Sequence, residues 1–95
     1  MIKRVVKMTF KAEHIERFKD IFSASQPLIK AMDGCQHVEL LQDVDNPCVF
    51  FTLSIWDSTH CLDNYRHSDL FAGVWGKTKI LFDAKPEAWS LNQIK

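Results

Sequence analysis

Hydrophobic and polar residues alternate along the first stretch of the chain. Between residues 2 and 10 the apolar side chains fall on every second position, which is the period of a β-strand. Arg4 lies on this apolar face, and two interpretations of it are open: the side chain snorkels out of the strand end, or it faces a ligand. The apolar face consists of Ile2, Val6, Met8 and Phe10.

A helical period follows between residues 13 and 32. Apolar residues recur there every three or four positions, so we expect an amphipathic helix. Pro27 has no backbone N–H and crowds the preceding turn, which predicts a kink or a short second helix capped by Ser25. Gly34 ends the pattern, because glycine is favoured just past a helix C-terminus.

Two further strands are predicted at residues 35–43 and 48–56. The connection between them has the composition of a turn, and so short a connection implies an antiparallel hairpin. The second strand is apolar on both faces, which is typical of a central strand with something packed over each side. The helices of one chain can cover only one face of the sheet, so we expect a partner subunit on the other.

Two short helices and a last strand complete the pattern. Ser58 and Ser68 are good N-caps for helices at residues 59–67 and 69–82. Glycines weaken the second of these helices, and close packing against a neighbour would account for them. The final strand is expected at residues 87–94. The glycines are Gly73 and Gly76.

This order of elements, β-α-β-β-α-α-β, predicts an α+β fold of the ferredoxin-like type with a four-stranded antiparallel sheet. With 95 residues the chain is expected to form one domain, residues 1–95. A chain so short buries a limited share of its surface. Its 46% hydrophobic and 12% aromatic content therefore favours an apolar pocket, a dimer interface, or both.

Charge and cysteine usage exclude several classes of function. Twelve basic and twelve acidic residues give no net charge, so we expect no nucleic-acid partner. No stretch approaches the ~20 apolar residues of a membrane span, and no secretory signal is recognisable. The three cysteines are isolated and no histidine pair has metal-ligand spacing, which predicts free thiols in a cytoplasmic protein without a metal site.

His37 is the candidate catalytic residue of the predicted sheet. It shares a strand face with Cys35, Glu39 and Leu41. A histidine in a pocket could act as a general acid or base, or orient a phenol or carbonyl group of a substrate. The alternative is a half-buried strand histidine that bonds to a neighbour or to water.

Several aromatic residues fall on one side of the two short helices. Any one of them could belong to the core, but together they favour the wall of a pocket, because pockets combine aromatic rings with a few polar groups. The expected substrate-binding residues are Trp56, Tyr65, Ser68, Phe71 and Trp75.

The combination of W-x-S and Y-x-x-S-x-x-F resembles the antibiotic biosynthesis monooxygenase family. The likeness extends upstream to the D-G-C break after the first helix and to the E-L-L-Q-D strand, and it covers nearly the whole chain. These motifs stand at Trp56 and Ser58, at Tyr65, Ser68 and Phe71, at 33–35 and at 39–43.

The resemblance implies a ferredoxin-like protomer and a homodimer whose two sheets face each other in an α+β barrel. Some members of the family oxidise phenolic or quinol intermediates with dioxygen and without a cofactor. The chain is thus expected to be a cofactor-independent monooxygenase for a small aromatic substrate, with His37 as the acid–base group. The alternative is a non-catalytic, small-molecule-binding or stress-associated dimer of the same fold.

Other relatives of this family bind and degrade haem, and the sequence departs from their pattern. Their iron ligand is a histidine four residues after the phenylalanine that matches Phe71, and here that position is Trp75. An asparagine of their first strand is also missing, since Val6 and Lys7 stand there. The indole has no lone pair to offer iron, so we expect no haem.

Overall fold

The computed structural model describes all residues, 1–95, and has the predicted order of strands and α-helices. A single 3₁₀ turn precedes the first helix. The elements are β1 (Ile2–Thr9), η1 (Ala12–His14), α1 (Ile15–Lys30), β2 (Cys35–Gln42), β3 (Val49–Trp56), α2 (Thr59–Arg66), α3 (Asp69–Lys79) and β4 (Glu87–Asn92). No helix combines the length and the apolar character that crossing a membrane requires.

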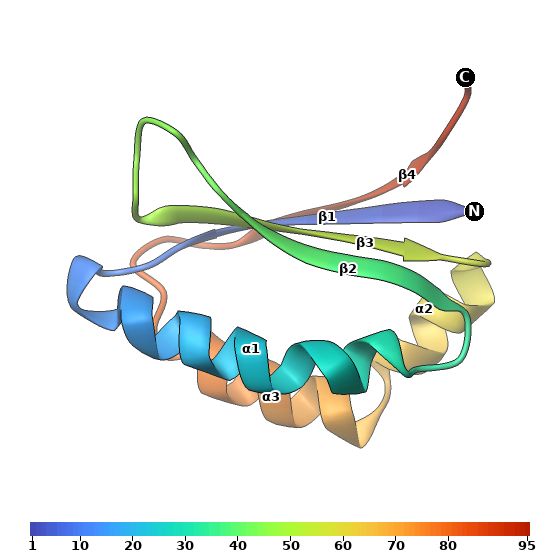
Figure 1. Cartoon of the computed structure of the whole chain (residues 1–95), viewed down its shortest axis with the longest axis horizontal. Helices are drawn as coiled ribbons and strands as arrows, with labels where there is room; N and C mark the ends of the chain where they lie inside the picture. The colour runs from blue at the N-terminus through green and yellow to red at the C-terminus, as the bar shows by residue number, and fades with distance from the viewer.

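The four strands form one antiparallel sheet in the order β2-β3-β1-β4. Strand β3 is central, as its two apolar faces predicted. The ferredoxin-like α+β fold is therefore confirmed. All three α-helices lie on the same side of the sheet, with α1 and α3 running alongside each other beneath it (Figure 1).

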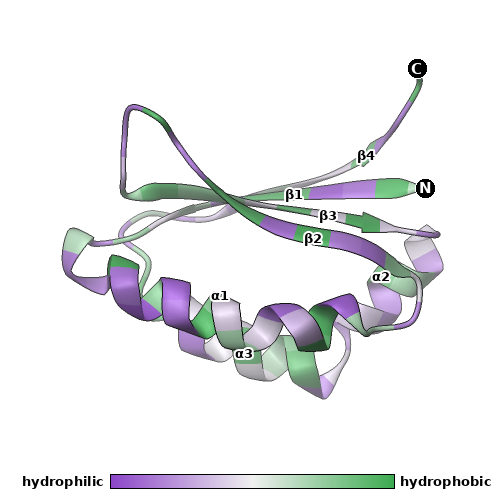
Figure 2. Ribbon diagram, in the orientation of Figure 1, coloured by the Kyte–Doolittle hydropathy of each residue, from purple (hydrophilic) through white to green (hydrophobic).

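The hydrophobic core lies between the sheet and these helices. One cluster is built around Phe10, Phe18 and Phe50, whose rings contact each other at centroid distances of 4.1–5.9 Å. A second cluster surrounds Trp56, which is completely buried, near the start of α2. In Figure 2 the ribbon of α1 alternates between hydrophobic and hydrophilic colours, as expected of a helix with one buried side.

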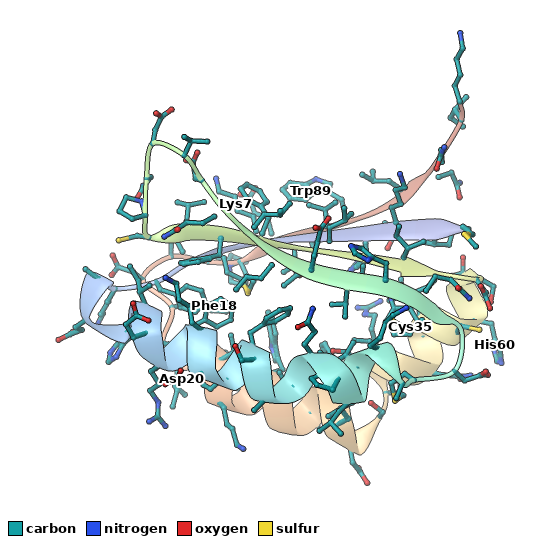
Figure 3. All side chains as sticks on the ribbon, viewed as in Figure 1. Lys7, Phe18, Asp20, Cys35, His60 and Trp89 are labelled. Atoms are coloured by element: carbon teal, nitrogen blue, oxygen red, sulfur yellow. The ribbon has the colours of Figure 1, made fainter.

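The opposite face of the sheet is not covered by any helix. Figure 3 shows Trp89 and Lys7 on this outer face, whereas Phe18 points from α1 toward the sheet on the inner side. Residues that pair directly across strands share a face, so Val5 and Leu53 lie on the outer face with Trp89. Several large apolar side chains are thus presented to solvent. The outer apolar face comprises Val5, Leu41, Phe51, Leu53, Ile55, Trp89 and Leu91.

Three local expectations about the helices are wrong: a second helix at Pro27, the extension of α3 to residue 82, and close packing at the glycines of α3. Helix α1 runs through Pro27 without a second helix, and the Ser25 hydroxyl donates to the Ile21 carbonyl at 2.6 Å instead of capping a new N-terminus. Helix α3 ends at Lys79, before Phe82. Its two glycines are not packed closely either, since a Cβ atom added at either position would meet nothing within 4 Å.

Candidate functional site

A cavity of about 360 Å³ lies between the inner face of the sheet and the helices. Its volume falls in the range of ~300–1,000 Å³ that is usual for small-molecule sites. Thirteen of its twenty lining residues are hydrophobic, and they come from all four strands and all three α-helices. Every residue of β4 is exposed, so the cavity opens along this edge strand, where Glu87 and Ala88 line it.

Three of the predicted aromatic residues form one wall of this cavity. Tyr65 and Phe71 meet edge to face at 5.3 Å, and Phe71 stacks on Trp75 at 5.9 Å with only 9° between the ring planes. Ser68 positions them from the turn between α2 and α3. Its hydroxyl accepts a hydrogen bond from the Phe71 N–H at 3.1 Å and donates to the Tyr65 carbonyl at 2.6 Å. Ser68 itself does not line the cavity.

Trp56 lies behind this wall and does not line the cavity. Its ring stacks on Tyr65 at 5.0 Å, and its Nε1–H donates to the Ser54 hydroxyl at 3.0 Å. Because Trp56 is 0% exposed, it supports Tyr65 from the core and has no surface to offer a ligand.

Tyr65 is a neutral hydrogen-bonding group at physiological pH. Burial is the main cause that raises the pKa of its phenol to about 12, and the charge on Cys35 adds to the effect. The hydroxyl therefore stays protonated and cannot serve as a general base near neutral pH.

Arg4 also lines the cavity, in the first half of β1. It is paired with Ser54 on one side and Ser90 on the other, and its Nη1 donates to the Ser90 hydroxyl at 2.9 Å. Burial, followed by the positive charge of Arg66, lowers the pKa of Arg4, while Asp63 opposes this shift. Arg4 thus lies at the cavity with a partly exposed side chain, a position compatible with its interpretation as a ligand-facing residue.

Arg66, at the end of α2, is a second lining cation that sequence reasoning missed. Its Nη1 lies 3.9 Å from an Asp63 carboxylate oxygen, an i,i+3 pair at the solvent edge. Its spacing gave no signal, because consecutive residues of a helix point in different directions.

His37 lies on the outer face of the sheet, away from the cavity. A β-bulge between Cys35 and His37 leaves Gln36 unpaired, so Cys35 points into the core while His37 points outward. The prediction that Cys35 and His37 share a face is therefore wrong. On the outer face the Nε2 atom of His37 is 3.5 Å from the Glu39 carboxylate, and both side chains are half exposed.

The cavity residues do not fit the haem site of the family. The position on α3 that a histidine would occupy is Trp75, and no histidine or cysteine is among the lining residues. No three residues of the types His, Cys, Asp and Glu gather anywhere in the chain in a way that could hold a metal ion.

Comparison with known proteins places this geometry in a family. No functionally curated protein matches the sequence. Among the solved structures that share this fold, a conserved protein from Methanosarcina mazei Go1 has a TM-score of 0.93 and 22% identity, with 97% of this chain and 91% of that chain covered. An antibiotic biosynthesis monooxygenase has a TM-score of 0.92 and 15% identity, with both chains covered to 100%. Rv0793 from Mycobacterium tuberculosis has a TM-score of 0.91 and 15% identity, with 99% of this chain and 95% of that chain covered. The sequence model of the antibiotic biosynthesis monooxygenase family matches residues 1–74, and the chain belongs to that family.

Proposed function

We propose that the protein is a cofactor-independent monooxygenase that oxidises a small aromatic substrate of the quinol or anthrone type. The observation that carries this proposal is the apolar cavity with its wall of Tyr65, Phe71 and Trp75 in a chain of this family. Flat rings stack on such a wall, and the sheet and helices exclude water from the reacting carbon.

The proposed reaction balances with dioxygen as the only co-reactant. An anthrone-type substrate loses a proton, and the resulting anion supplies electrons to dioxygen. Its CH₂ group becomes a carbonyl, one oxygen atom enters the product, and the other leaves as water with the two hydrogens. Because His37 lies outside the cavity, this chemistry depends on stabilising the substrate anion and not on His37 as a base.

Oxygen uptake tests the proposal directly. Chelator-treated protein should consume dioxygen with at least one member of a panel of hydroquinones and anthrones, with saturation kinetics. Phe71→Ala and Trp75→Ala should lower kcat/KM by about tenfold or more, because each removes a ring that holds the substrate. The matched control is Ile80→Ala, a large exposed residue just past α3 that does not line the cavity. Uptake no faster than the protein-free blank for every substrate would refute the proposal.

A non-catalytic binding protein is the second candidate, and one observation favours it. No histidine lines the cavity, Tyr65 stays protonated near neutral pH, and the carboxylate of Glu87, the only acidic lining residue, lies 3.8 Å from the Lys7 ammonium group of the outer face. This candidate predicts saturable binding of the same aromatic compounds without turnover. Reproducible oxidation that is lost in Trp75→Ala would exclude it.

The proposed partner is a second copy of the chain that covers the outer apolar face. This face carries Val5, Leu53 and Trp89 where no helix lies, and exposed apolar surface of this kind marks an interface. The proposed location is the cytoplasm, because all three cysteines are free thiols.

A further inference from the structure

The polar part of the cavity consists mainly of hydrogen-bond donors. Arg4 is the most informative of them, because its partly buried side chain lines an otherwise mainly apolar cavity from the inner face of β1. A guanidinium carries several N–H donors, and here only one hydrogen bond, to the Ser90 hydroxyl, is made. None of the ion pairs in the chain involves Arg4.

Two guanidinium groups line the cavity, and the two nearest carboxylates are paired with other cations. Arg66 adds a second guanidinium, which Asp63 balances only from the solvent side at 3.9 Å. Glu87 is the only acidic lining residue, and its carboxylate lies near Lys7, which stands on the outer face of the sheet. Burial is the main cause that lowers the pKa of Arg4, the charge of Arg66 adds to it and Asp63 opposes it, so an anion bound beside Arg4 would stabilise its charged form.

The Ser54 hydroxyl next to Arg4 extends the donor set of the cavity. The Ser54 oxygen already accepts the indole N–H of Trp56, so its own hydrogen remains free to donate toward the cavity. Ser90 does not line the cavity, but its oxygen accepts from Arg4 and thereby positions the guanidinium. A site with these donors and a guanidinium that has no ion-pair partner favours a ligand oxygen that is ionised.

We propose that the cavity binds an aromatic ligand bearing an anionic oxygen, a carboxylate or an ionised phenol, and that Arg4 holds this oxygen together with Ser54, while Ser90 positions the Arg4 guanidinium from β4. The inference specifies the ligand class of the site in the proposed function and rests on that site. Its rings lie against Phe71 and Trp75, and Arg66 provides a second positive charge at the solvent edge.

This arrangement also gives the chain a way to ionise a substrate without a general base. Contact with a guanidinium stabilises the phenolate over the phenol, so a bound phenol loses its proton to water at a lower pH than it does in solution. The ionised ring is the electron-rich form that gives electrons to dioxygen. Arg4 is then a catalytic residue of the proposed reaction, because it touches the substrate oxygen.

The test uses two probes of the same shape and different charge, 2-naphthoate and 2-naphthamide, with affinities measured by calorimetry on the full chain. The wild-type protein should bind the naphthoate about 10- to 100-fold more tightly than the amide. Arg4→Met should abolish this preference and Arg4→Lys should retain part of it. Arg17→Met, which removes an equal charge from an exposed position of α1 outside the main cavity, should leave it unchanged.

A second experiment distinguishes a phenolate ligand from a carboxylate ligand. If a phenolate is bound, 2-naphthol mixed with the protein at neutral pH should show the absorption band of the naphtholate, and Arg4→Met should remove it. A naphthoate preference without this band identifies a carboxylate ligand.

Equal affinity for the two naphthalene probes, binding of neither, or a preference that survives Arg4→Met would overturn the inference. If Arg4→Met fails to fold, two other measurements test the inference. Ser90→Ala should reduce the preference for naphthoate, because Ser90 accepts the hydrogen bond of Arg4. In the wild type, high salt should weaken the binding of naphthoate and leave the binding of naphthamide unchanged. The binding measurement does not require turnover. A preference for the charged probe without oxygen uptake would therefore refute the proposed function and leave this inference standing. Oxygen uptake without a preference sinks this inference alone.

Discussion

Tyr65 is the residue whose chemistry the fold changes most. It stacks on fully buried Trp56 on one side and meets Phe71 on the other, so water reaches its hydroxyl poorly. Loss of water disfavours the phenolate, and burial is accordingly the main cause of its raised pKa. The aromatic spacing in the sequence predicted that Tyr65 belongs to the pocket wall. Its raised pKa could be inferred only from the packing in the structure.

An alkaline absorbance titration tests this environment without interference, because Tyr65 is the only tyrosine of the chain. The tyrosinate band should appear with a midpoint near pH 12 in the folded protein. In a denaturant the midpoint should return to about 10. A native midpoint at about 10 would show that the hydroxyl is solvated.

The same shift predicts how stability depends on pH. The folded state holds the Tyr65 proton more tightly than the unfolded state, so the contribution is fully present below a pH of about 10 and is lost between about 10 and 12. The free energy of unfolding should fall by about 2–3 kcal/mol across this window. Denaturant unfolding of Tyr65→Phe should lack this part of the decline, and an unchanged decline would assign it to other groups.

The tryptophan at position 75 predicts that the protein does not bind haem. Its indole offers iron no lone pair at the position where haem-degrading relatives place a histidine. Titration of the purified protein with haem should therefore give no saturable one-to-one shift of the Soret band. Such a shift in the wild type that is lost in Trp75→Ala would contradict this prediction.

At the scale of elements, the predictable features were those fixed by local chemistry. Ser58 and Ser68 accept hydrogen bonds from the N–H groups of Cys61 and Phe71 as N-caps do, and period-two alternation placed the residues of β1 on the correct faces. The bulge at Gln36 leaves no such local signal, because it depends on how β2 pairs with β3. One inserted residue moved His37 to the other face of the sheet.

Helix α3 contains a site where stability should be easy to gain. A Cβ atom at Gly73 would meet no neighbour within 4 Å, so Gly73→Ala adds helix propensity without a clash. It should raise the free energy of unfolding by about 0.5–1 kcal/mol in a denaturant titration.

Gly34 provides the opposite comparison, since its φ is +80° and an added Cβ atom would lie 2.5 Å from the Cys61 sulfur. Gly34→Ala should therefore destabilise the protein, through backbone strain and the displacement of that sulfur. Equal effects of the two substitutions would show that packing around these glycines differs from the structure described above.

The whole molecule is a sheet with helices on one side only, and this asymmetry predicts its assembly. Leu53→Glu places a charge at the centre of the outer apolar face, next to Val5 in the pairing register. Light scattering should report twice the chain mass of 11.0 kDa for the wild type and the single mass for this variant. Ile80→Glu, on an exposed site beside α3, should keep the wild-type mass. A monomeric wild type would refute the proposed homodimer.

The three tryptophans lie in three different environments, so their intrinsic fluorescence can report on three separate processes. Trp56 is 0% exposed in the core, Trp75 lines the cavity and Trp89 is 42% exposed on the outer face. Emission from Trp56 should change only on global unfolding, from Trp75 on ligand binding, and from Trp89 on association of two chains. Phenylalanine substitutions made one at a time would assign each signal, so that three equilibria could be followed in one cuvette.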